Sequence, residues 1–203
     1  MASAGRLSNG VPNRKSFQMT NTASSVPNNL PLSLSSFIGR TQEIAELEHL
    51  LSSTRLLTLT GAGGCGKTRL ALRVATNTLS RFKDGVWWIE LAVLNDPILL
   101  PQTVLQNLGL PESLSRAPID LLTDYFQPKL SLLILDNCEH IIDACARFVA
   151  HLLQTCPQLT IIVTSREALN IDGELVWIVP SLQVPTIQPS STDRKSTRLN
   201  SSH

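Results

Sequence analysis

The sequence predicts an α/β protein in which a parallel β-sheet is covered by helices on both faces. From about residue 30 to 182, apolar runs alternate with helix-period segments, and strands that alternate with helices form parallel sheets buried on both faces. One apolar run leads directly into the glycine-rich stretch Gly61–Thr68, GAGGCGKT, and another ends in the carboxylate of Asp136. These observations predict one folded unit with a ligand site beside its strands.

The first expected elements lie between residues 41 and 91. Thr41–Ser52 places its leucines and an isoleucine on one helical face, with acids between them, so we expect an amphipathic helix. Leu56–Thr60 is a short apolar run that predicts a buried strand. Leu70, Ala71, Val74 and Ala75 follow at helical spacing. Val86–Leu91 predicts the next strand.

The second half continues the alternation. Asp96 before Pro97 is typical of a cap and first turn, and Gly109 is a suitable stop after Leu108, so a helix is expected between them. Ile141–Cys156 carries one apolar stripe and predicts a helix that packs on the sheet. The remaining expected strands are Leu132–Leu135, Leu159–Thr164 and Leu175–Val179.

Composition limits the functional classes. The chain has 203 residues, 42% of them hydrophobic, and a net charge of +1, which is typical of one ordinary globular domain. Neither a membrane span nor a signal peptide is predicted, and four cysteines without a CxxC pair favour a reducing compartment, so we expect a cytoplasmic location. Because the net charge is close to zero, direct nucleic-acid binding by this part is not expected.

The two ends of the chain differ from its middle in composition and periodicity. Residues 1–29 and 183–203 are rich in Ser, Asn, Thr or Pro and lack periodicity, so both are predicted to be disordered around a nucleotide-binding domain at 30–182. The last residues, Asp193–His203 (DRKSTRLNSSH), look like translated cloning adapter rather than native sequence. We therefore expect a C-terminally truncated fragment.

Gly61–Thr68 matches the Walker A pattern completely and predicts binding of a nucleoside triphosphate. A glycine-rich backbone can curl so that several N–H groups converge on phosphate oxygens, and the following helix turns its unpaired N–H groups to the same anion. Lys67 would add a charge for the β and γ phosphates, and the Thr68 hydroxyl would bind Mg²⁺. The loop glycines are Gly61, Gly63, Gly64 and Gly66.

Leu132–Asp136, LLILD, has the pattern of a Walker B strand. Such a strand is buried along its length and releases an acid at its carboxyl end, where open α/β sheets bind ligands. Asp136 would hold Mg²⁺ directly or through water. A turn or cap residue is the alternative role for this aspartate.

Four motifs in this order resemble the STAND class of signalling ATPases, and most closely the NB-ARC-like nucleotide-binding domains of bacterial LuxR-type and related transcriptional regulators. They are FIGR (37–40), GAGGCGKT (61–68), LDNCEH (135–140) and TSRE (164–167). The resemblance covers residues 30–182. It implies a three-layer P-loop NTPase fold with a mostly parallel five-stranded sheet in the order 5-1-4-3-2. It also implies an ATP/ADP switch that controls assembly and the output of attached domains.

The resemblance carries over to particular residues. Phe37, Ile38, Gly39 and Arg40 match the motif on the adenine side, although ordinary packing would also explain the two apolar residues. Arg166 matches the sensor arginine, which stabilises or reports the γ phosphate; a surface ion pair with a nearby acid is its alternative. Within and directly after the loop, the expected nucleotide-binding set also includes Cys65 and Arg69.

Hydrolysis is expected to be slow. Many relatives place a second acid after the Walker B aspartate, but Asn137 stands here and cannot act as a base. Glu139 is the nearest substitute, so the predicted catalytic group comprises Asp136, Glu139 and Arg166. We expect a domain that binds ATP, ADP and Mg²⁺, that self-associates through a longer protein, and that leaves DNA binding to another domain. A small P-loop kinase and a non-catalytic interaction module are the alternatives.

Overall fold

The structure, a computed structural model of the chain, describes residues 26–32 and 39–181. Five strands form one sheet, in the order β2-β3-β4-β1-β5. Every pairing between them is parallel. Their bounds are Leu56–Thr60 (β1), Val86–Glu90 (β2), Ser131–Asp136 (β3), Leu159–Thr164 (β4) and Glu174–Ile178 (β5).

The predicted three-layer α/β/α fold is confirmed, and so is the strand order, which is the expected order in the opposite direction. The sheet is wholly parallel, where a mostly parallel sheet was expected. The central strands β1, β3 and β4 are buried at every position, as a parallel sheet with both faces covered requires. All strands therefore present their carboxyl ends at one edge.

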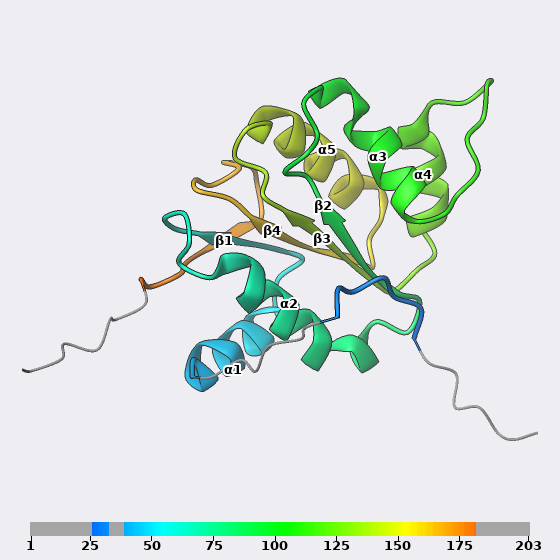
Figure 1. Cartoon of the computed structure of the whole chain (residues 1–203). Helices are drawn as coiled ribbons and strands as arrows, with labels where there is room; N and C mark the ends of the chain where they lie inside the picture. The colour runs from blue at the N-terminus through cyan, green and yellow to red at the C-terminus, as the bar shows by residue number, and fades with distance from the viewer. Residues whose placement is uncertain (1–25, 33–38, 182–203) are drawn as a thin grey trace, which may run out of the picture.

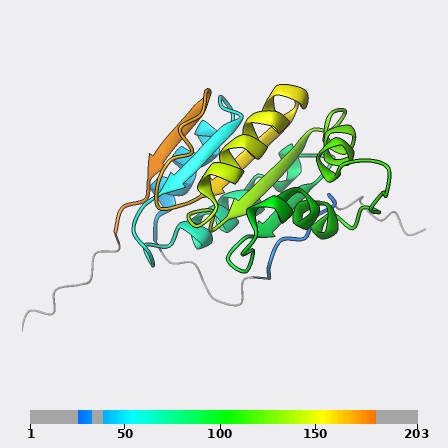
Figure 2. The same cartoon turned by 90° about the horizontal axis from the view of Figure 1, so that it is seen from above.

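Helices cover the two faces of the sheet (Figure 1, Figure 2). On one face lie α1 and α2, and on the other α3, α4 and α5. Two short 3₁₀ turns, η1 (Leu79–Arg81) and η2 (Pro97–Leu99), precede β2 and α3. The helices span Thr41–Leu50 (α1), Lys67–Asn77 (α2), Leu100–Asn107 (α3), Pro118–Phe126 (α4) and Ile142–Thr155 (α5).

Alternate strand residues serve two separate cores. On β4, Ile161 and Val163 pack in the core under α3, α4 and α5. Ile162, between them, packs in the core under α1 and α2. Successive side chains of a strand point to opposite faces, so one continuous apolar run supplies both layers. The P-loop helix α2 is anchored in the second core through Leu70 and Val74.

A segment near the N-terminus covers one edge of the sheet. Val86 donates its N–H to Pro27 O at 2.9 Å. The Asn29 amide accepts from Trp88 N at 2.6 Å and donates to Trp88 O at 2.9 Å, so one side chain takes the place of a neighbouring strand. Residues 27 and 29 thus contact β2, although they lie before the predicted start of the domain at residue 30.

Most predicted elements match within one or two residues. β1 and β4 have the predicted bounds, and the helix expected to end at Gly109 is η2 followed by α3. Asp96 caps it, accepting from Ile98 N at 3.0 Å. Helix α4, with Leu122 and Phe126 buried, was not placed by the pattern.

Candidate functional site

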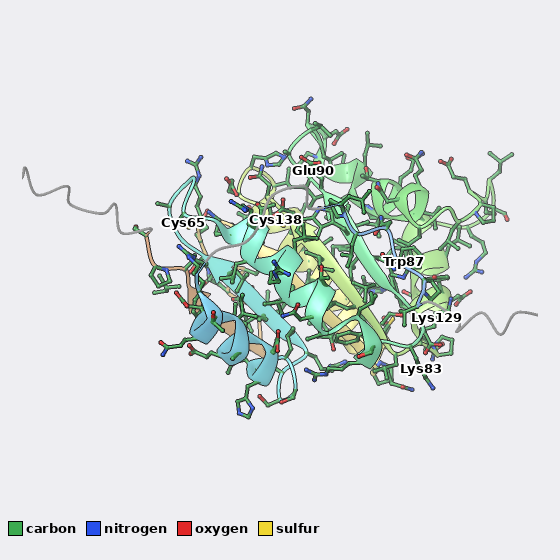
Figure 3. The ribbon with its side chains drawn as sticks, turned by 60° about the horizontal axis from the view of Figure 1, so that its bottom comes forward. Cys65, Lys83, Trp87, Glu90, Lys129 and Cys138 are labelled. Carbon is green, nitrogen blue, oxygen red and sulfur yellow. The ribbon has the colours of Figure 1, made fainter. Side chains whose placement is uncertain are left out.

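The site is built at the carboxyl ends of β1, β3 and β4, which are adjacent in the sheet in the order β3-β4-β1. β1 leads into the glycine-rich loop, and β3 ends in Asp136. β4 ends in Thr164 and leads to Arg166. Figure 3 shows Cys65, Glu90 and Cys138 toward this end of the sheet, with Lys83 and Lys129 toward the other.

The loop after β1 has the backbone that phosphate binding requires. Gly61, Gly64 and Gly66 have φ values of 146°, 77° and 94°, a region that residues with a Cβ rarely adopt. At Gly61 there is also little space, because a Cβ would lie 3.0 Å from Cys65 Sγ and 3.1 Å from Val179 O, so these neighbours would have to shift. Gly66 is the N-cap of α2, and because glycine has no side chain, nothing at this position obstructs the helix N–H groups.

Lys67 lies folded against its own loop. Its side chain is only 8% exposed, and Nζ donates to Gly61 O at 2.8 Å and to Ala62 O at 3.1 Å. An ammonium group has three donors. These contacts place the charge inside the curl of the loop, where phosphate oxygens would lie.

Asp136 lies across from the start of α2 and is only 5% exposed. Its Oδ1 accepts from Thr68 Oγ1 at 3.0 Å and also from Thr164 Oγ1. Burial raises the pKa of the Asp136 carboxyl above its ordinary value, the two hydroxyl hydrogen bonds oppose this rise, and the charges of Glu90 and Glu139 add to it.

The donor set fits Mg²⁺. This ion takes oxygen ligands and is commonly held by one or two carboxylates together with substrate phosphates. Thr68 and Asp136 supply a hydroxyl and a carboxylate 3.0 Å apart. The buried carboxylate, with Glu90 and Glu139 near it, would be stabilised by a cation. In the part of the chain that the structure describes, no group of three or more His, Cys, Asp or Glu residues forms another metal site.

Thr164 organises the turn after the Walker B strand. Its hydroxyl oxygen accepts from Asn137 N at 2.9 Å while it donates to Asp136. Asn137 has a φ of 68°, in the left-handed region, which asparagine tolerates better than most residues. The sequence identifies Thr164 only as the first residue of the motif TSRE, because its contact with Asp136 depends on how β3 and β4 pair.

Arg166 and Glu139 form an ion pair at the rim of the site. Arg166 Nε lies 3.2 Å from Glu139 Oε1, and the two side chains are 68% and 20% exposed. The other carboxylate oxygen, Oε2, is buried without a hydrogen-bond partner among the described residues. On its other side Arg166 approaches the glycine-rich loop, since a Cβ on Gly63 would lie 3.8 Å from Arg166 Nη2.

The adenine-side motif is only partly described. Phe37 and Ile38 lie outside the described residues. Gly39 and Arg40 both have positive φ values and lead into α1, whose N-cap is Arg40. The Arg40 guanidinium donates to Pro180 O at 2.8 Å, which ties the start of α1 to the segment after β5.

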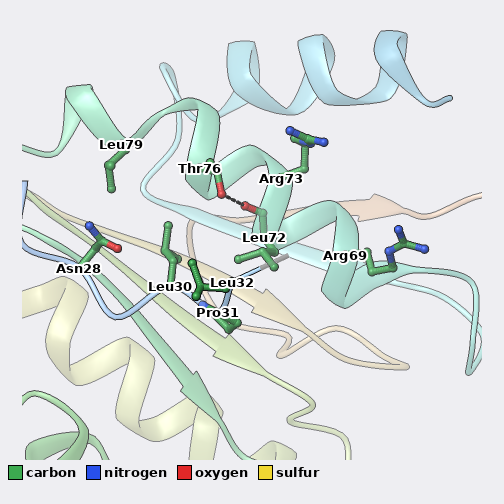
Figure 4. A pocket seen from close by; sticks show the side chains of 9 residues that line it. All are labelled: Asn28, Leu30, Pro31, Leu32, Arg69, Leu72, Arg73, Thr76 and Leu79. Atoms are coloured by element: carbon green, nitrogen blue, oxygen red, sulfur yellow. Dashed lines mark hydrogen bonds between the residues drawn. The ribbon is translucent and has the colours of Figure 1, made fainter. Parts of the chain in front are cut away.

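A pocket of about 360 Å³ lies between α2 and the N-terminal segment (Figure 4). Leu30, Pro31 and Leu32 of the N-terminal segment form one wall, and Leu72 of α2 faces them. Among the predicted nucleotide-binding residues, Arg69 lines this pocket. Arg69 is exposed and directly follows Lys67 and Thr68 on α2.

The strand order, the glycine-rich loop and the Walker B carboxylate define a P-loop ATPase. The motif Gly61–Thr68 and Asp136 stand in the required structural context of strand, loop and helix. A family model described as an AAA domain matches residues 49–171. The chain belongs to this family.

Relatives and a solved structure are consistent with this assignment. Protein Rv0894 of Mycobacterium tuberculosis is 43% identical over 151 residues, which are 74% of this chain and 38% of that protein. Rv0890c of the same organism, whose name describes an HTH-type transcriptional regulator, is 42% identical over 135 residues, or 66% of this chain and 15% of that protein. The chain thus spans well under half the length of these relatives.

The fold is similar to that of the STAND protein PH0952 of Pyrococcus horikoshii, which has a tetratricopeptide repeat sensor. The TM-score is 0.50 at 18% identity, over 78% of this chain and 25% of that one. The predicted resemblance to STAND-like P-loop ATPases of transcriptional regulators is confirmed by the family, this fold and the regulator relatives. In the described part of the chain, no helix is long and apolar enough to cross a membrane.

Proposed function

We propose that this domain is an ATP/ADP-binding switch with slow Mg²⁺-dependent hydrolysis, within a signalling or transcription-regulatory protein. The observation that carries the proposal is the convergence of Lys67, Thr68 and Asp136 at the N-terminus of α2. Backbone N–H groups, an ammonium group and a metal-binding oxygen pair there meet the three needs of a Mg²⁺-polyphosphate.

In this proposal each element has one role. The glycine-rich loop and Lys67 bind the β and γ phosphates, Thr68 and Asp136 hold Mg²⁺, and Arg166 senses the γ phosphate. Mg²⁺, when bound, neutralises phosphate charge. The proposed nucleotide-binding set around this centre also includes Phe37, Ile38, Gly39, Arg40, Cys65 and Arg69.

Slow turnover is supported by the residues near the expected attacking water. Asn137 holds the position where a base would stand, and an amide cannot accept a proton from water. Glu139 is the substitute base that the sequence offers after Asn137, and its Oε1 already accepts a hydrogen bond from Arg166 Nε. A switch needs long-lived nucleotide states, and this site offers little general-base assistance.

The regulatory role is supported by the relative named as an HTH-type transcriptional regulator, of which this chain matches only a part. We propose that self-association and DNA binding belong to the longer protein. The kinase alternative is disfavoured, because α5 ends at Thr155 and β4 begins at Leu159, leaving no room there for an arginine-bearing lid.

The test is calorimetric titration of the purified domain with ATP and ADP, with and without Mg²⁺, alongside a single-turnover hydrolysis assay. Lys67→Ala should abolish binding, whereas Lys83→Ala, which removes the same charge from an exposed position before β2, should not. Nucleotide binding that is absent, or unchanged by Lys67→Ala, would favour a non-catalytic interaction module.

A further inference from the structure

The position of Arg166 in the sheet gives its guanidinium two neighbours of different chemistry. Because β4 lies between β3 and β1, a residue just after β4 can reach the turn after β3 on one side and the loop after β1 on the other. Arg166 contacts Glu139 on the first side at 3.2 Å. Its Nη2 lies near Gly63 on the second.

The contact with Glu139 has the properties of an exchangeable bond. It involves one oxygen and one nitrogen, Glu139 Oε1 and Arg166 Nε, rather than a two-bond fork. Arg166 is 68% exposed and Glu139 is 20% exposed, so water reaches the arginine end of the pair, and ion pairs that are open to water are weak. A phosphate group presents more charge and more oxygens to a guanidinium than this carboxylate does.

We propose that Glu139 is a positioning residue that keeps the Arg166 guanidinium engaged, beside the phosphate loop, until a γ phosphate displaces the carboxylate. The inference rests on the proposed nucleotide-binding function. In the diphosphate state Arg166 stays on Glu139, and in the triphosphate state it moves to the γ phosphate beside Gly63. The same movement frees the Glu139 carboxylate near Asp136, so the presence of the third phosphate is converted into a change at the rim of the site.

The exchange makes Glu139 a competitor of the γ phosphate. Removing its charge should therefore strengthen ATP binding more than ADP binding, because ADP has no group that uses Arg166. An ion pair that is partly open to water, as this one is, corresponds to about a two- to fivefold change in an equilibrium constant. If Glu139 had a purely structural role, removing its charge would instead weaken the binding of ATP and of ADP to the same extent.

The experiment is a double-mutant cycle on the ratio of dissociation constants for ADP and a non-hydrolysable ATP analogue, both with Mg²⁺. Glu139→Gln should raise this ratio about two- to fivefold, and Arg166→Gln should bring it toward one. In the Arg166→Gln background, Glu139→Gln should have no further effect. Glu167→Gln is the matched control, since it removes a neighbouring exposed acid.

A ratio unchanged by Glu139→Gln, or raised equally with and without Arg166, would overturn the inference while leaving the proposed function intact. If the unmutated domain bound neither nucleotide, the proposed function itself would be refuted. If Glu139→Gln does not fold, Glu139→Asp decides, because its shorter side chain keeps the charge but weakens the contact. Glu139→Asp should raise the ratio of the two dissociation constants, and an unchanged ratio would count against the proposed role of Glu139.

Discussion

The hydroxyl of Thr164 forms two hydrogen bonds that support the turn after the Walker B strand. We expect Thr164→Val to destabilise the domain. The side chain is 1% exposed, accepts from Asn137 N at 2.9 Å and donates to Asp136 Oδ1. Valine has nearly the same shape, so the packing of β4 changes little. What is lost is the pair of hydrogen bonds.

The magnitude follows from these two bonds. A neutral hydrogen bond contributes about 1 kcal/mol and one to a charged group about 1.5–3 kcal/mol, so the free energy of unfolding should fall by about 2–4 kcal/mol. With an m-value of about 2 kcal/mol/M, the urea midpoint should fall by roughly 1–2 M. The pKa of Asp136 should also rise further, because the Thr164 hydrogen bond is one of the two that lower it.

Urea denaturation of the nucleotide-free domain at neutral pH measures the change, and Thr58→Val is the matched control. Thr58 is fully buried on the neighbouring strand β1, and its Oγ1 has no hydrogen-bond partner among the described residues. The same substitution there should be neutral or stabilising, since it removes an unsatisfied polar group. If Thr164→Val were no less stable than Thr58→Val, the proposed support of the turn would be refuted.

Three further changes test other parts of the structure. Burial raises the pKa of Asp136, so the folded state keeps a proton that the unfolded chain has released, and stability should decrease as pH rises from about 4 through the raised value. Asp136→Asn should abolish that decrease and stabilise the nucleotide-free domain at neutral pH. In this variant Mg²⁺-ATP should no longer raise the melting temperature. If the dependence of stability on pH were the same as in the unmutated domain, the role given to the Asp136 carboxyl would be wrong. Gly61→Ala should cost about 1–3 kcal/mol of stability by calorimetry, because φ is 146° and the new Cβ would meet Cys65; a wild-type melting curve would contradict this. Asn29→Ala should cost about 1–2 kcal/mol and speed amide hydrogen exchange at Trp88, whose N–H it holds, and unchanged exchange would show that the edge is protected otherwise.

The layered fold was predictable because its signals are local. β1 is bounded by the glycine of the loop that follows, and the buried runs of β3 and β4 are continuous, so their type and limits follow from the chain itself. Helix α4 has only nine residues and follows a polar stretch, and its stability comes from burying Leu122 and Phe126 against neighbours that the pattern does not reveal.

The site was predictable as a set of residue types but not as a set of contacts. The motifs identified Asp136, Glu139 and Arg166, and the resemblance supplied the strand order that brings them together. The sequence left two roles open for Arg166, and the structure shows the ion pair; the sensor role remains a prediction. Partners such as Asn29 and Trp88, 59 positions apart, depend on tertiary register and carry no local signal.

The folded-in position of Lys67 has a consequence for how fast a ligand can be captured. Its ammonium group donates to the carbonyls of Gly61 and Ala62, so the side chain itself supports the curl of the loop. Little chain ordering then remains to be done during association, which favours rapid capture. Since two of the three ammonium hydrogens bond to carbonyls of the loop itself, a substitution at Lys67 removes support for the loop backbone as well as a positive charge for the phosphates.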